Sequence, residues 1–335
     1  MQNKDLILGI DTSNYTTSLA LTDTNGKIVM NSRKLLSVRQ GERGLRQSYA
    51  LFQHMENLPD MVLDIFGRTN KERLGAVAAA GRPRPVKDSY MPVFKAGVNY
   101  GKVMAASLGV PFFEFSHQEG HLEAVRHDSS LSEASEFIAY HLSGGTTELL
   151  HIDKDAYRLL GGSRDLAFGQ VLDRVGVALG FEFPSGGKLD AIAVETKERL
   201  GNSASPSADR PSGLQQSDKA AGLKRIPIDG LEINLSGLET QCQRELHSGA
   251  EPDMLIYELF CVIAECLCRL TEKTVSETNC PDVLFTGGVS ASRFVRNQIE
   301  HYFSGKPVRI VFGNPALSSD NAVGISFLGG RKLWQ

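Results

Sequence analysis

Two histidines four residues apart have the spacing in this chain that most directly permits chemistry. His117 and His121 lie within residues 115–126, and in a helix they would be one turn apart on the same face. Two neutral imidazole nitrogens so placed can bind one divalent metal, at about 2.0–2.1 Å each. A solvated or hydrogen-bonded helix face is the alternative interpretation. Gln118 follows the first histidine, where a zincin metalloprotease carries its catalytic Glu, so protease chemistry is disfavoured.

Three short turns rich in glycine or hydroxyl groups each follow an apolar run that is typical of a strand. They occupy residues 11–14, 143–147 and 287–288. Such turns expose backbone N–H groups to phosphate oxygens, although each turn alone commonly does no more than reverse the chain. Together they indicate a nucleotide site. The predicted contacts are Ser143, Gly144, Gly145, Thr146, Gly287 and Gly288.

Three carboxylates are candidates for the same chemistry. Asp11 is the candidate catalytic residue, facing phosphate and orienting a hydrated metal or a nucleophile; its alternative role is in a turn or cap. Asp173, on a predicted helix, can accept hydrogen bonds from ribose hydroxyls or be an ordinary exposed helical Asp. Asp320 stands at a predicted helix start, where Asp is usually an N-cap but can complete a two-His, one-carboxylate metal set.

The elements that must position these residues follow from hydrophobic periodicity and turn signals. A strand–turn–strand pattern over residues 6–22 returns over residues 137–152, which predicts a duplicated architecture of two lobes, each offering one turn to a shared cleft. Further strands are expected at residues 27–30, 76–80, 111–115 and 283–286, and helices at residues 44–66, 95–108, 171–179, 251–278 and 290–302.

Length and composition indicate an ordinary globular protein of α/β class with two domains. The chain has 335 residues, 41% hydrophobic and 22% charged, and a net charge of −3, which argues against a uniformly basic nucleic-acid surface but not against a local basic stripe. We expect lobes at residues 1–130 and 131–335, with a flexible insertion at about residues 201–224. Five cysteines without a metal-like CxxC spacing, no signal peptide and no membrane-spanning run predict a reducing, cytoplasmic location.

Seven stretches spread over nearly the whole chain resemble the tRNA threonylcarbamoyladenosine transferase family, once labelled sialoglycoprotein endopeptidases. They are GIDTSNYTTSLAL, FSHQEGHLEA, HLSGGTTELL, LAFGQVLDRVGVALGFEFPSGGKLDAIA, INLSGLETQ, FTGGVSASRFVRNQ and SSDNAVGIS. The resemblance implies the two-lobed actin-like ATPase fold of the sugar kinase and actin superfamily. The paired histidines with a late Asp-Asn are its specific part, because ordinary sugar kinases lack them.

The resemblance also implies an activity and a site. The chain would be an acyltransferase that moves a threonylcarbamoyl group from its adenylate to N6 of the adenine beside the anticodon of tRNA. His117, His121 and Asp320 would bind iron or zinc, and residues 141–145 would contact phosphate or the acyl group. ATP or the adenylate would be the bound nucleotide, and the partners would be tRNA, a paralogous subunit and a small ATPase. Asp173 and Gly186 would hold the ribose and adenine, with Ser292 near the base.

Four departures from the family pattern leave alternatives open. Tyr15 and Thr16 stand where the family usually carries adjacent acids, Ser292 replaces an Asn, and Gly-Gly-Thr-Thr replaces Gly-Gly-His-Thr. A basic loop at residues 81–87 replaces a Gly-Pro-Gly turn; it can grip RNA or another anion, or be simply solvated. A different carbamoyl or acyl transferase, and a non-catalytic nucleotide-binding partner subunit, are therefore the alternative functions.

Overall fold

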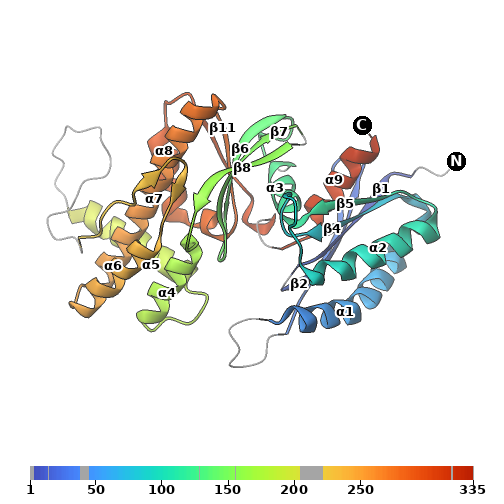
Figure 1. The fold of residues 1–335 in the computed structure, drawn as a ribbon, viewed down its shortest axis with the longest axis horizontal. Helices are drawn as coiled ribbons and strands as arrows, with labels where there is room; N and C mark the ends of the chain where they lie inside the picture. The colour runs from blue at the N-terminus through green and yellow to red at the C-terminus, as the bar shows by residue number, and fades with distance from the viewer. Residues whose placement is uncertain are drawn as a thin grey trace. The chain divides into compact units, whose positions relative to one another are not determined.

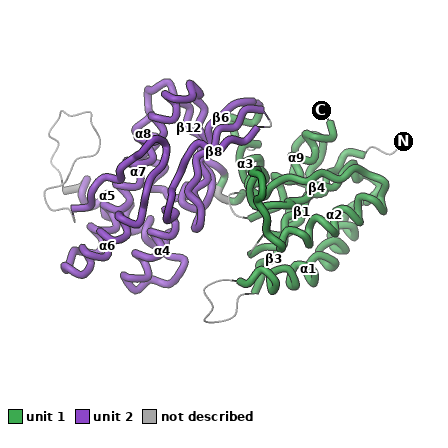
Figure 2. Tube along the Cα trace, viewed as in Figure 1, with its two compact units in different colours: residues 1–132, 314–335 green, residues 133–313 purple. Residues whose placement is uncertain are grey.

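A computed structural model of the chain describes residues 4–13, 15–37, 45–127, 129–154, 156–203, 222–317 and 320–334. These residues form two compact units (Figure 2). Unit 1 contains residues 1–132 and 314–335, and unit 2 contains residues 133–313. Each unit is built around one sheet, and the predicted α/β class is confirmed. Within the described ranges, no helix has both the length and the apolar character needed to span a membrane.

The sheet of unit 1 has the order β3-β2-β1-β4-β5. Strands β1, β2 and β3 are antiparallel neighbours, whereas β1, β4 and β5 run parallel. Alternation along β1 directs Leu6, Leu8 and Ile10 to one face, where they pack with buried residues of α1 and α2. The strands are β1 (Leu6–Thr12), β2 (Thr16–Asp23), β3 (Ile28–Leu35), β4 (Leu74–Arg82) and β5 (Phe112–Ser116).

Helices cover both faces of this sheet (Figure 1). Helices α1 (Gln47–Arg68) and α2 (Lys95–Leu108) pack on the face with Leu6, Leu8 and Ile10. Helices α3 (His117–His127) and α9 (Val323–Trp334) pack against each other on the other face, and Phe327 of α9 is buried beside Ala20 of β2. The C-terminal helix is therefore part of the first unit's core.

Unit 2 has a seven-stranded sheet in the order β12-β11-β6-β7-β8-β10-β9. Its helices lie together on one side of the sheet (Figure 1). The strands are β6 (Glu136–Leu142), β7 (Thr147–Asp153), β8 (Ala156–Ser163), β9 (Ile228–Asp229), β10 (Glu232–Ile233), β11 (Asp282–Thr286) and β12 (Arg309–Phe312). The helices are α4 (Phe168–Ala178), α5 (Gly186–Ser203), α6 (Ser236–His247), α7 (Pro252–Thr278) and α8 (Arg293–Phe303).

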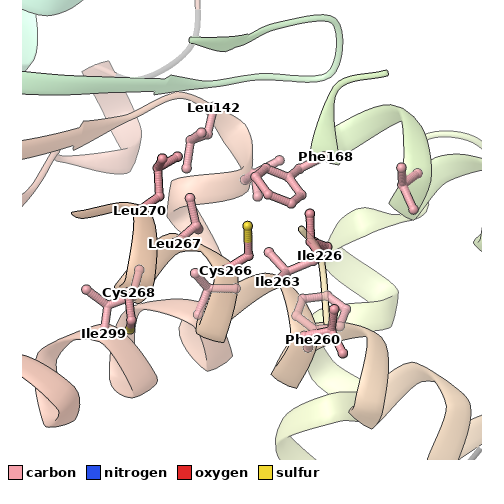
Figure 3. Packing of buried hydrophobic residues seen from close by; sticks show 14 of the residues in the cluster. Leu142, Phe168, Ile226, Phe260, Ile263, Cys266, Leu267, Cys268, Leu270 and Ile299 are labelled. Atoms are coloured by element: carbon pink, nitrogen blue, oxygen red, sulfur yellow. The ribbon is translucent and has the colours of Figure 1, made fainter. Parts of the chain in front are cut away.

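The long helix α7 provides much of the core of unit 2. Cys266 and Cys268 lie among leucine, isoleucine and phenylalanine side chains (Figure 3), and burial raises the pKa of each thiol to about 12. Neither thiol is therefore a nucleophile near neutral pH. Tyr140 of β6 stacks on Phe285 of β11, with 4.6 Å between ring centroids, and its hydroxyl lies 3.2 Å from the donating Thr271 hydroxyl of α7.

The predicted duplication is visible in the strand order. In unit 1, β3, β2 and β1 are followed across the sheet by the parallel strands β4 and β5; in unit 2, β8, β7 and β6 are followed by the parallel strands β11 and β12. Each sheet thus begins with a meander and continues through parallel crossovers. The end of the first strand, β1 in unit 1 and β6 in unit 2, therefore carries candidate site residues in both units.

Several expected boundaries differ from the structure. Asp11 and Thr12 were predicted to be turn residues, but strand pairing with β2 continues through them to Thr17. The helix expected at residues 44–66 is α1, which starts at Gln47; Gly44 lies outside the described residues. Asn14 of the first predicted turn also lies outside them. The helix expected at residues 290–302 is a 3₁₀ turn, η3 (Gly288–Ala291), followed by α8.

The C-terminal segment also differs from the expected division at residue 130. Residues 314–335 were assigned to the second lobe, yet they belong to unit 1 because the apolar face of α9 is buried by β1, β2 and β4. The insertion expected at residues 201–224 falls mostly outside the described residues, although α5 continues to Ser203.

Candidate metal centre and phosphate-binding turns

Helix α3 begins directly at the candidate histidine pair because its N-terminus is capped. The Glu119 N–H donates to Ser116 Oγ (3.2 Å), and the Ser116 N–H donates to Glu119 Oε2 (2.6 Å). This reciprocal arrangement is a capping box, which satisfies two backbone N–H groups at the helix start. His117 is therefore the first helical residue, and His121 follows one turn later on the same face.

Three side chains of unit 1 converge beyond this helix start. His117 Nε2 and His121 Nε2 are 3.0 Å apart, and Asp320 Oδ1 lies 3.2 Å from His121 Nε2 and 3.6 Å from His117 Nε2. Donor atoms around a tetrahedral ion with bonds near 2.05 Å are separated by about 3.3 Å. The predicted set His117, His121 and Asp320 thus has the spacing of three ligands of one ion.

Asp320 reaches this place because α9 packs very closely on α3. A Cβ atom on Gly324 would overlap the carbonyl oxygen of Gly120, so glycine at this position lets the two backbones touch. Asp320 is not the N-cap of α9, although its position in the sequence predicts that role. The helix starts at Val323, whose N–H donates to Asn321 Oδ1 at 2.9 Å, so Asn321 rather than Asp320 satisfies this backbone group. The Asp320 side chain is left to face the histidines.

Asp11 lies behind His117 rather than on the surface of a turn. Its side chain is about 1% exposed, and Asp11 Oδ2 accepts a hydrogen bond from His117 Nδ1–H at 2.7 Å. Because an ionised carboxylate only accepts, this bond assigns the ring proton to Nδ1 and leaves Nε2 facing His121 and Asp320. Carboxylate, histidine and metal in this order are a common arrangement that fixes a ligand's orientation. The expectation that Asp11 faces phosphate does not match its burial.

The electrostatics of this cluster favour a positive charge. Burial by itself lowers the pKa of His117, but the charge and hydrogen bond of Asp11, together with Asp320, raise it to about 10. Burial likewise works against ionisation of Asp320, yet both histidines hold the pKa of Asp320 well below its usual range. A divalent cation therefore competes with the His117 proton for a place between two carboxylates.

The residues present fit a divalent metal. Two imidazole nitrogens and one carboxylate oxygen are the donor types of non-haem iron and of many zinc sites, and three ligands leave coordination positions open for an oxygen donor of a substrate. Among the described residues, Asp11 Oδ1 is also buried without a hydrogen-bond partner, so the carboxylate keeps accepting capacity beside the cluster.

A second group of metal-ligating side chains, Glu136, His151 and Cys280, lies in unit 2. His151 Nε2–H donates to Glu136 Oε1 at 2.9 Å, and Arg158 Nη2 lies 3.4 Å from His151 Nδ1. A metal on Nε2 would move the ring proton to Nδ1, where it would meet the guanidinium, which cannot accept a hydrogen bond. This group is better described as a partly buried histidine held by hydrogen bonds to Glu136 and Arg158.

The two candidate phosphate-binding turns of unit 2 lie at the same end of its sheet. Strands β6 and β11 are parallel neighbours, with Thr286 opposite His141, so the residues that follow both strands lie at the same end. Cβ atoms on Gly144, Gly145 and Gly288 would have no described atom within 4 Å, so there is open space beside these three residues.

Two further features support a ligand at this edge. The hydroxyl of Thr286 is buried and has no hydrogen-bond partner among the residues described, so a polar group is left for a bound molecule to satisfy. Gly169 at the start of α4 touches the Ser143–Gly144 backbone so closely that a Cβ would overlap it. The N-terminus of α4, with its favourable field for anions, is therefore held beside the turn.

Asp173 and Ser292 have partners within the protein. Asp173 Oδ1 accepts the Ser185 N–H at 2.8 Å, which connects α4 to the start of α5 at Gly186. The Ser292 hydroxyl donates to Asp190 Oδ1 at 2.5 Å and accepts the Val295 N–H at 3.1 Å. Ser292 is thus the N-cap of α8, and a contact with a base would have to compete with these bonds.

The sequence reasoning missed four supporting residues, namely Asp190, His54, Ser116 and Glu119. Asp190 accepts the Arg293 and Phe294 N–H groups at 2.9 and 3.0 Å and so orders the start of α8. His54, fully buried, links Thr17 Oγ1 (2.7 Å) to the Ser13 carbonyl oxygen (2.8 Å) beneath the end of β1. The Ser-x-x-Glu spacing at Ser116 and Glu119 could have been read from the sequence as a capping box, but the other contacts join distant segments.

Comparison with known families shows to which family the chain belongs. The sequence profile described as TsaD, tRNA N6-adenosine threonylcarbamoyltransferase, matches residues 32–327. The chain belongs to this family. The match includes the paired histidines, Asp320 and all the residues of unit 2 that we expect to bind phosphate, whereas Asp11 precedes it.

Individual members of the tRNA N6-adenosine threonylcarbamoyltransferase family align over nearly the whole chain. The protein of that name from Neorickettsia sennetsu is 25% identical over 339 residues, covering 99% of this chain and 94% of its own length. A probable bifunctional tRNA threonylcarbamoyladenosine biosynthesis protein from Methanothermobacter thermautotrophicus is 24% identical over 328 residues. There the match covers 97% of this chain but 55% of the relative, so this chain spans about half the length of that protein.

Solved structures show the same fold at low identity. HypF of T. kodakarensis has a TM-score of 0.55 and 14% identity, covering 98% of this chain and 48% of its own. Component A of the (R)-2-hydroxyglutaryl-CoA dehydratase of Acidaminococcus fermentans has a TM-score of 0.52 and 16% identity, covering 99% and 100%. The expected actin-like ATPase and sugar kinase fold is confirmed.

Proposed function

We propose that this chain is a metal-dependent, adenylate-binding acyltransferase that transfers a threonylcarbamoyl group to N6 of the adenine next to the anticodon in tRNA. The observation that carries the proposal is the convergence of His117, His121 and Asp320 in a member of the tRNA N6-adenosine threonylcarbamoyltransferase family. Family membership supports tRNA modification, and the donor set supports a metal in the reaction. The family also supports tRNA, a paralogous subunit and a small ATPase as partners.

In this proposal, each group of the chain has a defined task. His117, His121 and Asp320 hold iron or zinc, and the metal supplies Lewis-acid stabilisation of negative charge on a substrate oxygen. Asp11 acts through His117: its hydrogen bond keeps the imidazole turned with Nε2 toward the cluster. Asp11 is then a positioning residue rather than a group that touches substrate.

The open glycine backbones of unit 2 hold the adenylate. The N–H groups of Gly144 and Gly288 and the Ser143 hydroxyl bind phosphate oxygens and stabilise the charge of the departing adenylate, as polar donors do in other acyl transfers. The Gly145 N–H donates to Ser143 Oγ at 3.3 Å, which leaves the Ser143 hydroxyl proton for the ligand. Thr146 closes the first turn, where its carbonyl oxygen accepts the Ser143 N–H, and Gly287 shapes the second with φ 92°. Asp173 and Gly186 lie at the ribose end. The nucleophile belongs to the RNA, so the chain need not provide one.

A second candidate function, a non-catalytic nucleotide-binding partner subunit, is favoured by one observation. Tyr15, 45% exposed, and the buried Thr16 stand where the family usually carries acids. Such a protein would bind adenylate and metal without turnover. The presence of His117, His121 and Asp320 supports the enzyme over this alternative, because a site without catalysis does not need three converging metal ligands.

The test measures metal content and threonylcarbamoyladenosine formation together. Purified wild type, supplied with threonylcarbamoyl adenylate and unmodified tRNA, is compared with His117→Ala, Asp320→Ala and the matched exposed variant His301→Ala. We expect the first two to lose bound metal and at least a hundredfold in turnover, and His301→Ala to retain both. Undiminished turnover by His117→Ala protein contradicts metal dependence. Nucleotide and metal binding without turnover by wild type, even with partner proteins added, favours the partner subunit.

A further inference from the structure

The loop between α4 and α5 displays an aromatic ring that the fold itself does not use. Phe183 is 75% exposed, more than any other aromatic side chain among the residues described. Its neighbour Glu182 is also exposed and pairs with Lys188 of α5 at 3.9 Å. Single exposed apolar residues are common on proteins, so exposure alone assigns nothing. The way in which the Phe183 loop is anchored indicates a role for this side chain.

Both ends of the loop are held by α4. On one side, the Phe181 N–H donates to the Gly176 carbonyl oxygen at 2.9 Å, and Phe181 packs against the core of unit 2. On the other side, Ser185 is fully buried and its N–H donates to Asp173. A Cβ on Gly176 would overlap the Ser185 side chain, so loop and helix are in close contact. Phe183 is thus exposed on a short loop that is anchored at both ends.

The anchors belong to the proposed adenylate site. Asp173, which holds Ser185, is the candidate ribose contact, and Gly186 follows directly after Ser185. The first turn of the same helix α4 touches the phosphate-binding turn at Ser143 and Gly144. Phosphate turn, ribose carboxylate and aromatic ring are therefore connected through one helix, in the order of the parts of a nucleotide.

We propose that Phe183 is a stacking platform for a purine base at this site. The inference rests on the proposed nucleotide function and adds a specificity-determining residue to it. The side chain offers an apolar face with no polar group, so it would select for the presence of a planar base rather than for a hydrogen-bonding pattern. The base can come from the adenylate or from an RNA nucleotide, and the test separates these sources.

The experiment measures binding by wild type, Phe183→Ala, Phe183→Tyr and the matched control Leu159→Ala, an exposed apolar residue on β8 of the same unit. The ligands are AMP, ribose 5-phosphate and an unmodified anticodon stem-loop RNA. We expect Phe183→Ala to bind AMP, the RNA or both roughly 5- to 150-fold more weakly, with ribose 5-phosphate unchanged. Phe183→Tyr and Leu159→Ala should bind like wild type.

The outcomes assign the base and keep the two proposals separate. Weakening confined to AMP assigns the adenylate base, and weakening confined to the stem-loop assigns an RNA base. If Phe183→Ala binds both AMP and the RNA as tightly as wild type does, the stacking role is overturned while the nucleotide site stays intact. Failure of wild type itself to bind AMP overturns the nucleotide site and the stacking role with it. A Phe183→Trp reporter in a Trp334→Phe background should be quenched by the ligand that stacks and not by ribose 5-phosphate.

Discussion

Individual contacts decide how the candidate metal ligands His117, His121 and Asp320 are held. His117 is fixed from two sides: Asp11 Oδ2 accepts its Nδ1–H at 2.7 Å, and the ring of Phe94 lies 5.8 Å away, centroid to centroid, at 47°. His121 meets the ring of His117 edge-on, with centroids 4.4 Å apart. The nitrogen atoms that face a metal are thereby oriented before it binds, which reduces the entropy lost on binding.

The first prediction concerns Asp11. Asp11→Asn keeps the size of the side chain but removes the charge that aligns His117, so metal affinity should fall roughly 10- to 100-fold. His117→Ala should abolish binding, and Asp60→Asn, an exposed residue of α1, should have no effect. Competition titrations with a chromophoric chelator measure all three. Wild-type affinity in Asp11→Asn would show that the hydrogen bond does not position the ligand.

The second prediction concerns His54 and pH. Burial lowers the pKa of His54 from 6.5, although the Ser13 carbonyl oxygen and Asp11 oppose the shift. The unfolded chain therefore binds a proton near pH 6.5 that the native protein binds only at lower pH. The contribution of His54 to native stability should be complete above pH 6.5. Below pH 6.5 this contribution should fall by up to about 1.4 kcal/mol per pH unit until the lowered pKa is reached.

Urea unfolding at pH 7.5, 6.0 and 5.0 measures this dependence. His54→Gln should be less stable than wild type at pH 7.5, because the bonds to Thr17 and Ser13 are weakened, but its stability should change less with pH. His301→Gln, on the exposed side of α8, should follow wild type. Parallel pH profiles for wild type and His54→Gln would contradict the assignment of a buried neutral imidazole.

At the scale of elements, helix ends are where most site residues are found. Helix α3 starts at His117 through the Ser116–Glu119 capping box, and α8 starts at Ser292 through Asp190. The N-terminus of α4 lies on the Ser143–Gly144 turn. Capped N-termini place N–H groups and side chains at defined positions, which loops of the same length do not.

The third prediction tests the cap of α8. Asp190→Ala removes an ionised acceptor of three hydrogen bonds and should reduce the free energy of unfolding of unit 2 by about 2–3 kcal/mol. Ser292→Ala should cost about 1 kcal/mol. Denaturation followed by circular dichroism measures both, with Glu195→Ala on the exposed side of α5 as the control. Because Asp190 and Ser292 share a bond, the double variant should lose less than the sum. Strict additivity would contradict the shared cap.

At the scale of the whole molecule, the chain returns to its first unit at the end. Val323, Ile325 and Phe327 of α9 are buried against strands of unit 1, and Asp320 comes with them. The candidate ligand set His117, His121 and Asp320 is therefore complete only when the last 22 residues of the chain, 314–335, are in place. Folding of this unit joins segments separated by the whole of unit 2.

The fourth prediction is that a chain ending at residue 313 loses the structure of unit 1. Burial of a large apolar side chain contributes about 1.5–3 kcal/mol, so several in α9 together approach the total stability of a domain. Hydrogen exchange should show amides of β1 and β4 unprotected while those of β6 and β11 stay protected. The full-length control Lys332→Ala, exposed on the same helix, should exchange like wild type. Retained protection of β1 in the truncated chain would contradict the prediction.

Much of the local organisation follows from the sequence alone. Alternating apolar residues in residues 6–22 and again in residues 137–152 predicted two strand–turn–strand copies, and the sheets contain them as β1–β2 and β6–β7. The four-residue spacing of His117 and His121 placed both on one helix face. Side-chain directions within a strand or helix repeat every two or 3.6 residues, so these conclusions need no knowledge of the rest of the chain.

Other features were decided only by the tertiary structure. No local signal shows that Asp11 contacts His117, 106 residues away, that Ser292 is engaged by Asp190, or that α9 packs on the first unit. Such contacts depend on which apolar faces cover each other, and many arrangements of the same elements satisfy a local pattern equally well. Close approach of α3 and α9 at Gly120 and Gly324 selects one of them, and it is that approach which brings Asp320 to the histidines.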